Sequence, residues 1–114
     1  MFDYLGVKLR LTNGRKTPIR PRGINGSQYK PHFRVNAKGE YLGVAFVDGP
    51  DTLEPGDEGE ITVALLYVDT GVDYSSLQIG TAVEVMEGHT IVATGTILRR
   101  FQDARHWRTY LGTA

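Results

Sequence analysis

Almost the whole sequence consists of short β-type segments separated by turns, and it shows no convincing helical period. In residues 5–11 the odd positions are apolar, whereas Lys8 and Arg10 between them are charged. An alternation of this kind is the period of a strand with one buried face. A turn signal, Asn-Gly, follows at residues 13–14. The pattern predicts an all-β domain.

Six strands follow from this reading of the chain. They are expected at residues 5–11, 31–35, 41–47, 60–67, 82–86 and 91–98. The strand at 60–67 is the clearest, because it is rich in β-branched residues. Its apolar positions fall on one face and are Ile61, Val63, Leu65 and Tyr67. The last two strands form a hairpin around residues 87–89, and only residues 69–78 leave room for a short helical turn. Six short strands predict a closed barrel or a sandwich, and a closed barrel removes the exposed edges that promote aggregation.

The length of 114 residues suits one domain with its own core. Hydrophobic residues make up 40% and charged residues 23%, as in an average soluble domain. There is no cysteine, so the chain has neither a disulfide nor a thiolate that could serve as nucleophile or metal ligand. The first residues lack the pattern of a signal peptide, and no apolar stretch is long enough to cross a bilayer. We therefore expect a cytoplasmic protein without a membrane contact.

Two segments interrupt the strand pattern. A long, ordered basic loop is expected at 14–28, where Gly and Pro are too frequent for a regular strand or helix. The β-barrel domain is expected to occupy residues 1–101, followed by a basic-aromatic C-terminal tail at 102–114. Trp107 and Tyr110 in this tail are either a strap packed on the barrel or an exposed docking element.

The net charge is zero, but the charges are segregated along the chain. Residues 1–38 contain nine Lys or Arg and one acid, whereas residues 39–98 contain eleven acids and no Lys or Arg. Residues 99–114 are basic again. Two interpretations are open: an interaction site, or strands of opposite charge that pair across one sheet.

A search for catalytic and metal-binding patterns finds one short match. Asp69-Thr70-Gly71 follows an apolar strand and resembles the Asp-Thr-Gly signature of retroviral-type aspartic proteases. That chemistry needs two carboxylates that share a proton, and a strand followed by a turn explains three residues equally well. The three histidines are far apart and have no metal-ligand spacing. We expect no enzyme, no cofactor and no metal site.

The basic residues of the N-terminal block lie among aromatic ones. They are Arg15, Lys16, Arg20, Arg22, Lys30 and Arg34, close to Tyr29, His32 and Phe33. Lys and Arg offer charge to phosphates, and aromatic faces stack on bases. This pattern is typical of an RNA-binding surface, or of a solvated basic face that balances the acidic middle. The zero net charge argues against strong non-specific binding of nucleic acid.

Four motifs in register suggest one family. They are Gly14-Arg15-Lys16-Thr17-Pro18, Tyr29-Lys30-Pro31-His32-Phe33, Pro55-Gly56-Asp57 and Glu87-Gly88-His89-Thr90-Ile91-Val92-Ala93-Thr94-Gly95. In order and spacing over residues 3–100 they resemble segments of the third domain of elongation factor Tu, which read Gly-Arg-x-Thr-Pro, Tyr-Arg-Pro-Gln-Phe, Pro-Gly-Asp and Glu-Gly-Gly-Arg-Thr-Val-Gly-Ala-Gly. The resemblance implies a six-stranded, closed antiparallel β-barrel of that type.

The resemblance also implies a function. The third domain of elongation factor Tu contributes to binding the acceptor and T stems of aminoacyl-tRNA and docks against the GTPase domain. The residues that would bind RNA or a partner by resemblance are Arg15, Lys16, Lys30, His32, Glu87 and Gly88. Two contacts of the family differ, since Leu42 stands in place of a Thr and Tyr67 in place of a Lys. The sequence has no counterpart of the GTPase domain or the second barrel, so we expect a stand-alone module that does not hydrolyse nucleotides.

Three functions remain open. The first is a translation-related binding module that contacts an RNA stem, such as that of a tRNA, through its phosphates. The second is a regulatory or immunity-type protein without an RNA role, whose acidic stretch 48–60 meets a basic protein. The third is the aspartic-protease-like enzyme through Asp69. Neither the partner nor the oligomeric state follows from the sequence.

Overall fold

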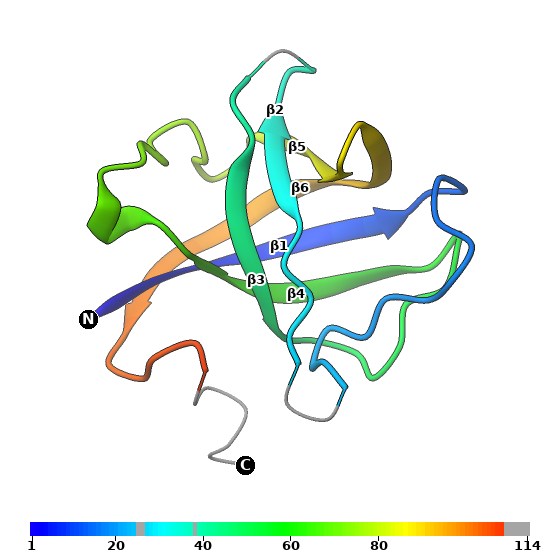
Figure 1. Cartoon of the computed structure of the whole chain (residues 1–114), viewed down its shortest axis with the longest axis horizontal. Coiled ribbons are helices and arrows are strands. Elements are labelled where there is room, and N and C mark those ends of the chain that lie inside the picture. Colours follow the sequence, from blue (N-terminus) through cyan, green and yellow to red (C-terminus); the bar gives the residue numbers. More distant parts are fainter. Residues whose placement is uncertain (25–26, 38, 109–114) are drawn as a thin grey trace.

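The computed structural model describes residues 1–24, 27–37 and 39–108. In these residues it contains six strands and one short 3₁₀ turn, and no α-helix (Figure 1). The elements are β1 (Phe2–Leu11), β2 (His32–Val35), β3 (Leu42–Asp48), β4 (Glu58–Leu65), η1 (Val68–Thr70), β5 (Ala82–Glu87) and β6 (Thr90–Asp103).

The six strands close into an antiparallel barrel in the order β1-β4-β3-β2-β5-β6, and β6 pairs with β1 again. The predicted closed barrel is therefore confirmed, and the sandwich alternative is wrong. The long strands β1 and β6 close the ring, with Leu5 opposite Arg100 on β6 and opposite Val63 on β4. The pairing of β1 with β6 has a bulge between Gly6 and Val7.

The interior of the barrel is filled by the alternating apolar positions of the strands. Leu5, Val7, Leu9 and Leu11 of β1 are all buried in one hydrophobic cluster, whereas Lys8 and Arg10 between them are exposed. The loops also contribute to this core. Ile19 of the long loop and Leu53 of the loop before β4 are buried there and joined by an antiparallel backbone bridge. The long loop is thus anchored to the barrel in its middle.

A second apolar cluster covers part of the outside of the barrel. Its buried members are Tyr4, Ala45, Val47 and Ala64, which come from β1, β3 and β4. Leu66, Phe101 and Trp107 pack against it. The Phe101 ring stacks on Tyr4, with ring centroids 5.6 Å apart. The chain after β6 therefore folds back onto the barrel.

This arrangement changes two expected boundaries. Strand β6 continues through Gln102 and Asp103, past the end of the barrel expected at 101. Trp107 packs on the second cluster as a strap would, whereas Tyr110 lies outside the described residues. Strand β4 ends at Leu65, so the expected place of Tyr67 on the buried face is wrong: Tyr67 is 46% exposed.

The short helical turn expected within 69–78 is the 3₁₀ turn η1, which begins one residue earlier. Tyr74 and Leu77, which follow it, are buried in the core. The Tyr74 hydroxyl donates to the carbonyl oxygen of Gly43 over 2.6 Å, and burial raises the pKa of this phenol. None of the described residues belongs to a helix that is long and apolar enough to span a membrane.

Candidate binding surface

Part of the charge segregation in the sequence is resolved by ion pairs across the barrel. In each of these pairs a basic residue from 1–38 meets an acidic residue from 39–98. The pairs are Lys8–Glu58 (2.9 Å), Arg10–Glu58 (3.1 Å), Arg22–Asp48 (3.2 Å), Arg34–Glu84 (3.0 Å) and Arg15–Glu87. Two of them follow from strand register, since Arg10 lies opposite Glu58 and Arg34 opposite Glu84. The interpretation that oppositely charged strands pair is confirmed for these residues.

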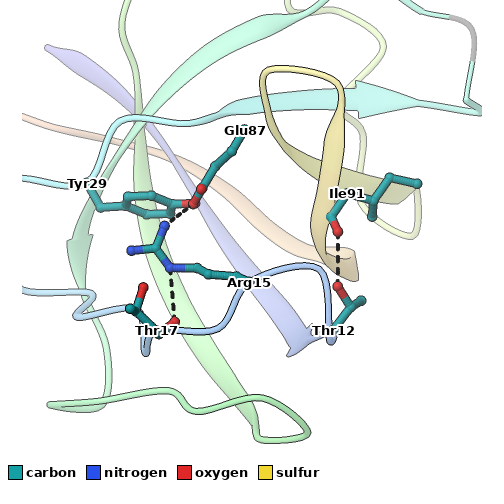
Figure 2. Close-up of polar contacts among 6 residues, drawn as sticks. All are labelled: Thr12, Arg15, Thr17, Tyr29, Glu87 and Ile91. Carbon is teal, nitrogen blue, oxygen red and sulfur yellow. Dashed lines mark hydrogen bonds and ion pairs between the residues drawn. The ribbon is translucent and has the colours of Figure 1, made fainter.

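One of these pairs forms the loop clamp, which we define as Arg15, Tyr29 and Glu87 (Figure 2). The Arg15 guanidinium and the Tyr29 hydroxyl both donate to the same oxygen of Glu87. The guanidinium carbon of Arg15 also lies 5.1 Å from the centre of the Tyr29 ring, and its Nε donates to the carbonyl of Thr17 over 3.1 Å. The clamp ties the start and the end of the long loop to the end of β5.

The clamp is partly shielded from water. The side chains of Arg15 and Glu87 are 24% and 34% exposed. Tyr29 packs edge-on against Phe46 with ring centroids 5.0 Å apart. Burial, together with the hydrogen bond to Glu87, raises the pKa of the Tyr29 phenol well above its ordinary range. Tyr29 therefore stays protonated as a donor to Glu87 throughout the neutral range.

A second contact holds the loop on the β5–β6 hairpin. The Thr12 hydroxyl donates to the carbonyl of Ile91 over 3.0 Å, as Figure 2 shows. Gly88 in the hairpin turn has a φ of 59°, a conformation in which glycine avoids the strain of a side chain. Gly88 thus shapes the turn next to Glu87.

The remaining predicted site residues, Lys16, Lys30 and His32, do not belong to the loop clamp. Lys16 is exposed. The Nζ atom of Lys30 lies 4.9 Å from the ring centre of Trp107. His32 is on β2, and its ring centre is 5.9 Å from that of Tyr41. The structure therefore joins Arg15 with Glu87, and it directs Lys30 toward the C-terminal segment.

The contact between Lys30 and Trp107 joins a predicted binding residue to the tail, and it brings in Arg108, which was not among the predicted site residues. Lys30, Trp107 and Arg108, with Ser27 and Gln28, line a shallow cavity of about 260 Å³. The guanidinium carbon of Arg108 is 4.9 Å from the Trp107 ring centre, the same distance as Lys30 Nζ. We call Lys30, Trp107 and Arg108 the tryptophan platform. The alternation of basic and aromatic residues in the tail was the only signal for it in the sequence.

Several basic side chains take no part in ion pairs. Within residues 1–24, 27–37 and 39–108, six Lys or Arg have no carboxylate at ion-pair distance: Lys16, Arg20, Lys30, Arg99, Arg100 and Arg108. Arg99 and Arg100 lie on β6, where Arg100 donates to the carbonyls of Tyr74 and Leu77. Lys16 and Arg20 belong to the long loop, and Lys30 lies two residues after it. Gln28 connects this region to the tail, since its Nε2 donates to the carbonyl of Trp107 over 3.2 Å. The loop and the tail thus form one surface with excess positive charge.

The Asp-Thr-Gly motif lies elsewhere. Asp69 is exposed within η1, and Gly71 ends the turn with a φ of 88°. Asp69 lines a small cavity of about 70 Å³ together with Met1, Phe2 and Trp107. Among the described residues no group of three or more His, Cys, Asp or Glu is placed to hold a metal ion.

No protein-family model matches this sequence, and no curated protein matches it.

Proposed function

We propose that this chain is a non-catalytic, translation-related binding module of the cytoplasm, similar to the third domain of elongation factor Tu, and that it binds an RNA stem through its phosphates. One observation carries the proposal: of the six Lys and Arg among the described residues that no carboxylate neutralises, four lie on the long loop, just after it, or on the tail. These four are Lys16, Arg20, Lys30 and Arg108.

The division between paired and unpaired cations decides which residues attract phosphate. A cation in an ion pair presents little net charge to a ligand, whereas an unpaired one acts at full strength within a Debye length of about 8–10 Å. Because Arg15 forms an ion pair with Glu87, we assign it the role of positioning the loop. Lys16 and Lys30 are the better anchors, because they are free to contact phosphates.

Asp69 has no catalytic role in this proposal. Its side chain is exposed in a surface turn. The aspartic-protease mechanism needs two carboxylates that share a proton about 3 Å apart.

The test is fluorescence anisotropy of a labelled tRNA titrated with the whole chain at 50 and 200 mM salt. If four cations neutralise four phosphates, affinity should fall about a hundredfold between these salt concentrations. The double variant Lys16→Gln/Lys30→Gln should bind more weakly and show a shallower salt dependence.

The matched control is Lys8→Gln/Arg10→Gln. It removes the same charge from residues that are already paired with Glu58 on β4. We expect this control to bind RNA nearly as well as the unchanged chain. Equal losses in both variants would contradict a site on the loop and would indicate an effect of net charge alone.

A protein partner is the second candidate, and the acidic loop before β4 favours it. Asp51 is 92% exposed, and its only ion-pair contact among the described residues is with Arg22 at 3.8 Å. Glu54 and Asp57 on the same loop are exposed as well. If the chain binds a protein instead, it should not bind RNA at 50 mM salt. It should form a complex of fixed stoichiometry with a basic protein, and Asp51→Asn should weaken that complex.

A further inference from the structure

We propose that the tryptophan platform is a binding site for a phosphate group carried by a nucleic acid strand. The choice of a nucleic acid rests on the function proposed above, whereas the site itself is argued from its own geometry. It adds two residues of the tail, Trp107 and Arg108, to the surface of the long loop.

The charge balance of the cavity calls for an anion. Among the described residues, its lining contains two cations, Lys30 and Arg108, and no carboxylate. Both cationic groups lie 4.9 Å from the same ring centre, so they are separated by no more than twice that distance. Like charges at this separation repel each other, and the face of an aromatic ring offsets only part of that repulsion. An anion bound in the cavity that both residues line lowers the repulsion.

The platform is held in place before any ligand arrives. The Trp107 ring packs on the second apolar cluster outside the barrel. Its carbonyl accepts a hydrogen bond from Gln28, and the carbonyl of Arg105 accepts one from the hydroxyl of Tyr4. The backbone N–H of Arg108 donates to Nδ1 of His106 over 3.1 Å. A site that is already ordered loses less entropy when it binds.

The donors around the cavity match a phosphate ester. Lys30 offers an ammonium point charge, and Arg108 offers a planar guanidinium that can donate two parallel hydrogen bonds to phosphate oxygens. Ser27 adds a hydroxyl at the rim. The volume of about 260 Å³ lies just below the usual range of about 300–1,000 Å³ for pockets that enclose a drug-sized ligand. It suits a phosphate with its adjoining sugar.

Trp107 is the only tryptophan in the chain, so its fluorescence reports directly on this site. We would titrate the whole chain at constant ionic strength with four probes: a short single-stranded RNA with a 5′-phosphate, the same RNA without it, inorganic phosphate and acetate. We expect a saturable change in Trp107 fluorescence with the phosphate-bearing probes and no change with acetate. A response only to the 5′-phosphorylated strand would assign the site to a terminal phosphate, and an equal response to both strands would assign it to the backbone.

Two variants test the residues. Lys30→Gln and Arg108→Gln should each weaken binding about tenfold, since each removes one charge-assisted contact and leaves Trp107 in place. Arg10→Gln removes a positive charge that is paired with Glu58 and does not line the cavity, and it serves as the control. The proposal would be overturned if acetate changed the Trp107 fluorescence as much as phosphate does. It would also be overturned if all three variants lost the same binding affinity.

Anisotropy of labelled tRNA, measured on the same samples, separates this proposal from the proposed function. Binding of tRNA without any change in Trp107 fluorescence would overturn the phosphate site and leave RNA binding intact. A saturable response to phosphate without tRNA binding would support the site and refute the RNA function.

Discussion

Replacing Glu87 by alanine should destabilise the protein more than its place near the surface suggests. Glu87 accepts hydrogen bonds from both Arg15 and Tyr29, and both donors are partly buried. Removing the acceptor leaves a partly buried guanidinium and a phenol without their partner. Hydrogen bonds to a charged group contribute about 1.5–3 kcal/mol, so we expect a loss of about 2 kcal/mol in the free energy of unfolding. For a domain of this size that lowers Tm by roughly 6–10 °C.

Glu58→Ala is the matched control for this variant. Glu58 also binds two basic side chains, and its own side chain is 37% exposed, close to the 34% of Glu87. Its partners Lys8 and Arg10 are 55% and 62% exposed, so water replaces the lost contacts. Glu58→Ala should therefore change Tm much less than Glu87→Ala.

Urea unfolding followed by circular dichroism measures both variants. A double-mutant cycle of Glu87→Ala with Arg15→Met isolates the coupling between the two side chains, which we expect to be about 1 kcal/mol or more. A Glu87→Ala variant as stable as Glu58→Ala, or a coupling energy near zero, would contradict this prediction.

Three further predictions concern the barrel itself. Gly95→Ala should cost about 3 kcal/mol, because its Cβ would lie 2.0 Å from the carbonyl oxygen of Lys8 on the neighbouring strand; an unchanged Tm would contradict this contact. Ala37→Gly should stabilise the protein by about 0.5–1 kcal/mol, since Ala37 has a φ of 59° that strains a side chain, and a lower Tm would show that this turn is not strained. The hydrogen bond and charge of Lys8 hold the pKa of Glu58 below its ordinary 4.5, so its contribution is present above that pH and is lost as pH falls through the lower value in the folded state. Urea unfolding at pH 7 and pH 3 should therefore show a smaller acid loss for Glu58→Gln than for the unchanged chain, and equal losses would refute this.

The strands could be predicted from the sequence because their signal is local. Alternation in β1 depends only on which side chains face the core, and the structure has the same alternation. The predicted positions of the strand ends were less accurate. The sequence placed Tyr67 in the strand that ends at Leu65, since an aromatic after a β-branched run extends the pattern. The chain leaves the sheet there because η1 and Tyr74 turn it over the end of the barrel.

The candidate site was less accessible to sequence reasoning. Arg15 looked like a free cation, and only barrel closure brings it onto Glu87, which is 72 residues away. The same closure places Trp107 beside Lys30. Such contacts depend on which strands become neighbours, and residue spacing does not encode that information. The charge pattern indicates that the basic and acidic blocks can pair, but it does not indicate which basic residue meets which acidic one.

The most direct test of RNA binding by the loop and tail is the position of the interface. Backbone amide NMR spectra of the whole chain, recorded as an RNA stem-loop is added at 50 mM salt, locate it residue by residue. We predict that the largest shifts fall in residues 14–30 and 105–108, with little change on β4. Shifts concentrated on the acidic loop at 50–58, or none anywhere, would contradict it.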